Sequence, residues 1–327
     1  MNPSIACRCC GSARTRLFGR AARARSFAGV PLAAPLDGGH LYRCTQCDLL
    51  MRHPLLTADA YVALYAPSAG DHWTKASLRP EQQKIRDHVW RVLPQGGRVL
   101  DVGCASGDLL EALGPAYQKF GVEPAAQARA RAQALGVQVV CSAVEELGSS
   151  ALKFDLITAV DVIEHVPDPL AFLRTLTRNL AAGGQIVVST GNSRARIWLL
   201  CGPSYYYSYF FEHLSFISPQ WWAHVANQEF EVTIIDPLFS HQEAQPLGKV
   251  RYAQKLARLG AKMVLSWLER AVLLRLPTLS RRLGLRLMLG EPGLFKDHVM
   301  AAVSLRSPGH VVGATAGPNP LPMEPTK

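Results

Sequence analysis

Two glycines, Gly103 and Gly107, follow a short apolar run and precede a stretch suited to a helix. In a parallel α/β sheet, a turn of this kind lies outside the carboxyl end of a strand, where such folds bind ligands. Glycine lets the backbone approach a ligand closely, and the next helix presents free N–H groups there. The spacing is not that of the dinucleotide motif Gly-x-Gly-x-x-Gly, and no P-loop lysine follows. The turn therefore predicts a ligand site outside these two motif classes.

An acidic residue, Glu123, ends a second apolar run about twenty residues farther along the chain. A carboxylate at that place can accept hydrogen bonds from both hydroxyls of a ribose. The turn and the acid together favour a ligand that carries a ribose. The alternative is a plain strand-to-helix turn that binds nothing.

Four cysteines form two Cys-x-x-Cys pairs, Cys7 with Cys10 and Cys44 with Cys47. Two thiolates on one tight turn can face the same ion, and two such pairs complete a tetrahedral zinc site. The 33 residues between the pairs exceed the usual short spacing, and Cys9 lies beside Cys10 as a competitor. Four thiolates leave no coordination position open, so the expected site is structural. Unligated, reduced thiols are the alternative.

The composition fits one large core with an appendage, since 48% of the 327 residues are apolar. The sequence has no apolar run of about eighteen residues, and its first residues carry cysteines and arginines in place of the apolar core that is typical of a signal peptide. We therefore expect a cytoplasmic protein without a spanning helix. In that compartment, the eight cysteines favour reduced thiols or metal binding over disulfides. The net charge of +10 makes nucleic acid and anionic membranes partners to consider.

Strand and helix patterns alternate from Arg98 onward, which predicts a parallel, doubly wound α/β sheet. The expected strands end at Val102 and at Glu123, or span residues 136–141, 154–160, 185–190, 231–236 and 298–305. The expected helices cover residues 80–93, 125–135 and 170–180, and another begins at Pro219.

Residues Leu100–Gly107 resemble the first motif, Leu-Asp-Val-Gly-Cys-Gly-x-Gly, of the class I S-adenosylmethionine-dependent methyltransferases, and differ from it at Ala105. The resemblance implies a Rossmann-like sheet of seven strands with an antiparallel last strand, and S-adenosylmethionine as the cofactor. Alanine is a mild replacement if its φ is negative, whereas a positive φ would narrow the methionine pocket. Within the family, the first motif binds the methionine end, Glu123 matches the ribose acid and residues 142–143 match the adenine turn. The implied cofactor-binding residues are Asp101, Gly103, Cys104, Ala105, Gly107, Glu123, Ser142, Ala143 and Asp161.

Three ionisable residues, Asp161, Glu164 and His165, follow the fourth expected strand. Their spacing lets them share one side of a helical turn. The segment is similar to the acid-x-x-Glu-His group of quinone-precursor O-methyltransferases, which is associated with a divalent cation. Such a cation could lower the pKa of a phenol and orient it. The alternative is that Glu164 and His165 hold the following helix by hydrogen bonds.

Residues 204–218 form an aromatic stretch similar to the acceptor-side loop of the family. Its histidine, His213, is the first candidate for a general base on an acceptor hydroxyl, because imidazole has a pKa near neutrality. Tyrosines 205–207 could form a wall for a sugar or an aromatic ring. The alternative is a packed aromatic cluster with a structural histidine. The candidate catalytic residues are His213, His165, Asp161 and Glu164.

The cysteine segment resembles the N-terminal zinc module of some bacterial small-molecule methyltransferases, including sugar C-methyltransferases. We expect a zinc module and linker over residues 1–65, a methyltransferase domain over 66–306 and a disordered tail over 307–327. A basic helical insert at about residues 240–296 separates the last two strands and is the clearest departure from the family. It could be a lid, or it could contact an anionic bilayer at the inner face of the membrane.

These features predict methyl transfer from S-adenosylmethionine to an oxygen or carbon of a small molecule: a sugar, a lipid-linked compound, or a quinone or phenolic precursor. A nucleic-acid methyltransferase is one alternative, with the cysteine pairs and the arginine-rich loop between them, residues 14–25, as its docking surface. It is disfavoured because residues 161–164 stand where an Asn-Pro-Pro-aromatic motif would follow the fourth strand. A zinc-stabilised binding module without catalysis is the other alternative.

Overall fold

The computed structural model describes residues 5–67, 78–148, 150–239 and 297–306, together with positions 257 and 260. The largest sheet in these ranges has seven strands in the order β12-β13-β10-β9-β6-β7-β8. The five strands β6 to β10 run parallel to one another. Strand β13 is antiparallel to its two neighbours, β10 and β12. The strands are β6 (Gly97–Val102), β7 (Tyr117–Val122), β8 (Gln138–Cys141), β9 (Phe154–Val160), β10 (Leu180–Gly191), β12 (Phe230–Phe239) and β13 (His298–Leu305). The predicted seven-stranded sheet with an antiparallel last strand is confirmed.

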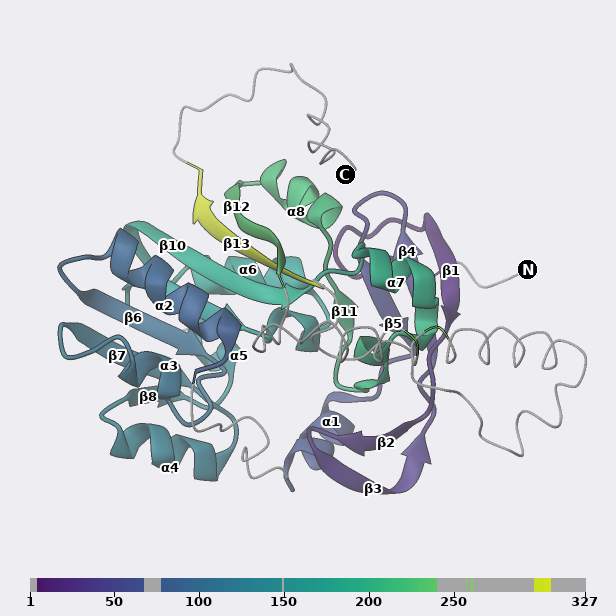
Figure 1. The fold of residues 1–327 in the computed structure, drawn as a ribbon, viewed down its shortest axis with the longest axis horizontal. Helices are drawn as coiled ribbons and strands as arrows, with labels where there is room; N and C mark the ends of the chain where they lie inside the picture. The colour runs from purple at the N-terminus through teal and green to yellow at the C-terminus, as the bar shows by residue number, and fades with distance from the viewer. Residues whose placement is uncertain are drawn as a thin grey trace, which may run out of the picture.

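Helices cover both faces of this sheet, so that the fold is doubly wound as predicted (Figure 1). They are α2 (Pro80–Val92), α3 (Asp108–Glu111), α4 (Ala126–Ala134), α5 (Val144–Leu147), α6 (Pro169–Thr177) and α8 (Pro219–Ala226). Side chains alternate along the strands. Val99 and Leu156 therefore pack toward α2 and α3, while their neighbours Leu100 and Ile157 pack toward α5, α6 and α8. The central strands β9 and β10 are mostly buried because both faces of the sheet are covered.

Two helices that frame the rim of the sheet begin at residues whose side chains cap them. Asp168 accepts hydrogen bonds from the N–H groups of Leu170 and Ala171 at the start of α6. Ser218 accepts one from Trp221 at the start of α8. Both caps are followed by proline, whose missing N–H costs nothing in the first helical turn. The helix predicted to open at Pro219 is confirmed.

A four-stranded sheet connects the cysteine segment to the rest of the chain, in the order β1-β4-β5-β11. Its strands are β1 (Thr15–Arg20), β4 (His40–Cys44), β5 (Leu50–His53) and β11 (Ser215–Phe216), and a hairpin of β2 (Ala24–Phe27) and β3 (Val30–Leu36) lies nearby (Figure 1). Helices α1 (Ala58–Tyr65) and α7 (Arg196–Cys201) complete this part. Cys47 and Met51 belong to the same buried cluster as the side chains beneath α6. The division of the chain at residue 65 stays a prediction.

The predicted strands 154–160 and 298–305 have the bounds of β9 and β13. Strand β10 is longer than expected because its pairing with β9 continues, after a register shift, back to Leu180. The predicted insert at 240–296 and tail at 307–327 lie outside the described residues. None of the helices in the described ranges combines the length and the apolar character needed to cross a membrane.

Candidate active site

The predicted ligand loop lies where β6 and β7 end side by side. Val102 pairs with Val122 in parallel register, which places Gly103 and Glu123 at the same edge of the sheet. The loop turns over β7, because the N–H of Gly103 donates to the carbonyl of Val122 at 2.8 Å. Gly103 has a φ of +72°, and a Cβ there would lie 2.7 Å from Cγ2 of Val162. Glycine is therefore required at this position both for its conformation and for space.

The carboxylate of Glu123 holds the loop. One of its oxygens accepts the N–H of Ala105 at 2.9 Å, and the other accepts the N–H of Ala125 at 2.8 Å. The residue is 7% exposed, and burial raises the pKa of its carboxyl group. Glu123 therefore lies next to the glycine turn, as a ribose-binding acid must.

The remaining predicted cofactor residues also lie at this edge. Asp101 is buried beneath the loop, where it accepts the hydroxyl of Thr158 at 2.6 Å, and burial raises its pKa to about 7. Cys104 is buried directly after Gly103. Ser142 and Ala143 follow β8, the neighbour of β7, and the Ser142 hydroxyl donates to Glu146 at 2.7 Å. The structure thus brings the predicted cofactor residues of three adjacent strands to one edge.

Ala105 has a φ of +46°, the left-handed region in which a side chain costs about 1–2 kcal/mol. Alanine in place of the family's glycine would be mild only at a negative φ, so at Ala105 the replacement is strained. We expect Ala105→Gly to raise the free energy of unfolding by about 0.5–1 kcal/mol, after the greater freedom of glycine in the unfolded chain is subtracted. Denaturant unfolding measures the change. Ala143→Gly is the matched control, because Ala143 has a φ of −136° and gains nothing from glycine. A loss of stability in Ala105→Gly would contradict this account.

Asp161 lies at the end of β9 beside the donor loop. Its N–H donates to the backbone carbonyl of Ser189 at 2.9 Å, and its φ is +54°. One carboxylate oxygen accepts a hydrogen bond from Arg79 at 3.0 Å. Arg79 precedes α2 and also pairs with Glu81 at 2.9 Å. Asp161 is thus held by an arginine that the sequence did not single out.

Of the predicted group of Asp161, Glu164 and His165, the last two come together with His213. One atom each of Glu164, His165 and His213 lie within 4.8 Å of one another, and Asp161 lies beside this group, where its charge contributes to the raised pKa of Glu164. Glu164 is fully buried, and its two oxygens accept the hydroxyls of Tyr207 and Thr190. Burial raises the pKa of Glu164 to about 7. Both oxygens of this carboxyl group already accept hydroxyls, which fits a cation poorly. A divalent cation at this group stays a prediction.

Two histidines face each other across this cluster, with ring centroids of His165 and His213 4.8 Å apart. Nδ1 of His213 lies 3.1 Å from the carbonyl of Tyr207, and Nδ1 of His165 lies 3.1 Å from that of Glu212. A carbonyl can only accept, so Nδ1 of His213 carries the proton and its Nε2 keeps a lone pair. His165 is also hydrogen-bonded to the backbone of Asp161, and its Nδ1 lies 3.4 Å from the hydroxyl of Tyr65. Burial lowers the pKa of both histidines, that of His213 well below its usual range, so both rings are neutral and His213 is a weaker base than a free imidazole.

Sequence reasoning missed a second polar cluster, at the start of β13. Nδ1 of His298 lies 2.8 Å from a carboxylate oxygen of Asp297, whose other oxygen accepts the hydroxyls of Tyr205 and Tyr206. Nε2 of His298 lies 3.9 Å from Asp161. Burial alone would lower the pKa of His298, but the hydrogen bond to Asp297 and the nearby carboxylates raise it to about 9. The only signal in the sequence was the adjacent Asp-His pair.

The four cysteines predicted to bind zinc come together. Sγ of Cys7 lies 3.5 Å from that of Cys47, and Sγ of Cys10 lies 3.6 Å from that of Cys44. All four sulfurs lie within 4.8 Å of one another. Tetrahedral zinc with bonds of about 2.3 Å needs sulfurs about 3.8 Å apart. Cys9 is outside this group and accepts the indole N–H of Trp221 at 3.3 Å. The residues fit a structural zinc ion.

The strand order, the antiparallel β13 and the glycine loop beside an acid define a class I methyltransferase fold. The family model described as a methyltransferase domain matches residues 74–240, and the chain belongs to this family.

Similar proteins carry related names. The ubiquinone biosynthesis O-methyltransferase of Idiomarina loihiensis is 40% identical over 113 residues, which cover 32% of this chain and 46% of that protein. The protein of the same name from Coxiella burnetii is 29% identical over 163 residues, or 45% of this chain and 69% of that protein. The chain spans about half the length of the first of these relatives. A crystal structure of the plantazolicin methyltransferase BpumL with SAH aligns at 14% identity, covering 69% of this chain and 84% of that chain, with a TM-score of 0.42.

Proposed function

We propose that this protein transfers a methyl group from S-adenosylmethionine to an oxygen or carbon of a small molecule. The observation that carries the proposal is the common edge on which Gly103 and Glu123 lie side by side, with Asp161 at the end of the next strand. The family match supports it. The names of the curated relatives favour an oxygen as the acceptor atom.

The residues present fit S-adenosylmethionine, which supplies a methyl group on a positively charged sulfonium. Gly103 and Gly107 would hold its methionine end, Glu123 its ribose, and residues 142–143 its adenine. The place where a Cβ of Gly103 would stand is taken by Val162, so this glycine lets the turn lie close to its neighbour. The group that fits the cofactor is the buried carboxylate of Glu123 beside the loop. Because the leaving thioether is neutral, the protein has mainly to align the two reactants.

The acceptor would lie against the rim formed by Asp161, His165 and His213. His213 accepts the acceptor's hydroxyl proton at Nε2, while its Nδ1–H stays bonded to the carbonyl of Tyr207. His165 presents a second neutral imidazole across the ring pair. The tyrosines at 205–207 are buried and pack edge-on against one another, so that they form the wall behind these histidines.

Calorimetric titration of the full chain with S-adenosylmethionine tests the donor site. Incubation with methyl-labelled S-adenosylmethionine and a panel of sugars, catechols and polyprenyl phenols tests transfer. Binding together with labelling of one class supports the proposal and names the acceptor. Absence of binding at about millimolar cofactor would leave the non-catalytic binding module as the function.

Contact with an anionic membrane was predicted for residues of the basic insert. Those residues lie outside the described ranges, and the membrane contact stays a prediction, as does the cytoplasmic location.

A further inference from the structure

The segment between β10 and α8, residues 192–218, carries the tyrosines and the histidine of the proposed acceptor wall. It leaves the seven-stranded sheet, crosses to the cysteine segment and returns. Within the described residues, four side chains of the cysteine segment contact its two ends and its middle: Arg8, Arg43, Asp48 and Arg52. Arg8 lies inside the first Cys-x-x-Cys pair, and Asp48 directly follows the second.

Arg8 lies between Cys7 and Cys10, and its guanidinium points out of the turn toward the rim. It donates to the carbonyl of Leu214 at 2.8 Å and to that of Pro167 at 2.9 Å, and a third bond of 2.7 Å reaches the carbonyl of Arg52. Leu214 directly follows His213, and Pro167 follows the turn that holds His165. One arginine therefore ties together the backbones next to both histidines.

Arg52 holds the middle of the segment from the neighbouring strand β5. Its side chain is fully buried and donates to the carbonyls of Ser208, Phe210 and His213, at 2.7, 3.1 and 3.0 Å, as well as to that of Gly38. Its own carbonyl accepts from Arg8. Arg8 and Arg52 therefore form one continuous contact from the first cysteine turn to the carbonyl of His213.

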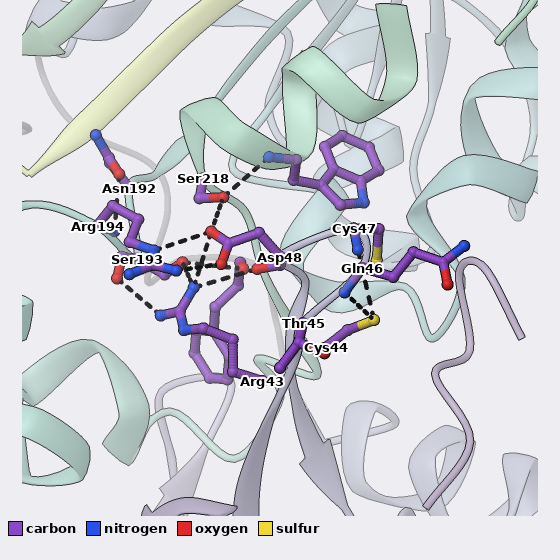
Figure 2. Close-up of polar contacts among 12 residues, drawn as sticks. Arg43, Cys44, Thr45, Gln46, Cys47, Asp48, Asn192, Ser193, Arg194 and Ser218 are labelled. Atoms are coloured by element: carbon purple, nitrogen blue, oxygen red, sulfur yellow. Dashed lines mark hydrogen bonds and ion pairs between the residues drawn. The ribbon is translucent and has the colours of Figure 1, made fainter. Parts of the chain in front are cut away.

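Asp48 holds the two ends of the segment, as Figure 2 shows. It follows Cys47 and has a φ of +64°. Its carboxylate accepts a hydrogen bond at 2.9 Å from Nε of Arg194, which lies just after β10. It accepts another at 2.7 Å from the hydroxyl of Ser218, which lies at the start of α8. Burial would raise the pKa of Asp48, but the hydrogen bond from Arg194 and the charge of Arg43 outweigh it and lower the pKa. The second cysteine turn thus contacts both ends of residues 192–218, which we call the acceptor segment.

We infer that the metal held by Cys7, Cys10, Cys44 and Cys47 sets the position of the acceptor segment, with Arg8 and Asp48 as positioning residues. The reason is geometric: the direction of each side chain depends on the conformation of a short turn, and a tetrahedral ion fixes both turns at once. The inference deepens the proposed function and rests on it for the meaning of the segment. Its structural part can be tested without methyl transfer.

Hydrogen exchange of the full chain, read by mass spectrometry with and without prior removal of zinc by a chelator, is the central measurement. Amides in residues 205–216 should exchange at least about tenfold faster after zinc removal, while those of β6, β7 and β9 keep their protection. Calorimetry on the same samples should give a dissociation constant for S-adenosylmethionine that changes by less than about twofold.

The variants Arg8→Met and Arg8→Lys separate a metal-dependent contact from a general loss of structure. In Arg8→Met with zinc bound, the same amides should already exchange about tenfold faster, and zinc removal should add little, because both changes break the same contact. Arg8→Lys keeps a positive charge with a single donor nitrogen and should restore part of the protection. Asp48→Asn, which tolerates a positive φ, should loosen residues 192–194 and 218 instead.

The control is Arg14→Met, which removes an arginine of the same segment whose side chain is exposed and bonds to Gln46. In this variant zinc removal should still accelerate exchange of residues 205–216 by the full amount. Unchanged exchange of these residues after zinc removal would overturn the inference, as would additive effects of chelation and Arg8→Met. If S-adenosylmethionine fails to bind in any form of the protein, the proposed function fails while the exchange result still stands.

Discussion

His213→Asn is expected to lower kcat for methyl transfer by about 10²–10⁴-fold, the usual contribution of a positioned acid or base. Asparagine can still donate from its amide to the carbonyl of Tyr207, as Nδ1 of His213 does, but it offers no basic nitrogen in place of Nε2. The loop should therefore stay packed while proton removal fails. Transfer of labelled methyl to an acceptor hydroxyl, measured under single-turnover conditions, gives the effect.

Two measurements make this result specific. The affinity of His213→Asn for S-adenosylmethionine, measured by calorimetry, should match that of the unaltered protein. His224→Ala, on α8, is the control for loss of a histidine and should keep full activity. Retention of wild-type kcat in His213→Asn would show that His213 is part of the packed aromatic cluster and not the base.

Glu123→Ala should weaken binding of S-adenosylmethionine by about 10- to 100-fold, because hydrogen bonds to a charged group contribute about 1.5–3 kcal/mol each. The same change removes the acceptor for the N–H groups of Ala105 and Ala125, which loosens the donor loop before the cofactor arrives. Both effects act in the same direction. Calorimetric titration measures the loss.

Glu123→Gln serves to separate these two effects, since the amide oxygen can still accept one of the two backbone N–H groups. Glu145→Ala removes an exposed acid of helix α5; it is the control for charge alone and should bind as tightly as the unaltered protein. An unchanged dissociation constant in Glu123→Ala would remove the ribose assignment.

The donor half of the site could be predicted because its information is local. A buried strand, a glycine turn and an acid at the end of the next strand are each visible in a short window of sequence, and parallel register then places Gly103 beside Glu123. The same holds for the bounds of β9 and β13, which are short, mostly apolar runs. The sign of φ at Ala105 could not be predicted, because the residue type alanine does not indicate a positive φ.

The acceptor half depends on contacts between residues far apart in the chain. Arg79 and Asp161 are separated by 82 positions, and Arg8 and Leu214 by 206. Arg79 belongs to no motif, and Arg8 occupies an unspecified position of a Cys-x-x-Cys pair, so nothing in the sequence distinguished either arginine from a solvated charge. His213 could be named from its loop, but its pairing with His165 required the fold. A short 3-10 turn, Ile163–His165, directs Glu164 into the core, where it meets His213.

The ladder between β12 and β13 has a consequence for how this fold can diversify. It runs to the pair of Phe239 and His298, so the two ends of the connection between these strands lie side by side, near the rim where His298 meets Asp161. Lengthening a connection that starts and finishes at one place costs little, about 0.6 kcal/mol for each doubling. New sequence can therefore be added beside the proposed acceptor rim without altering the strand order.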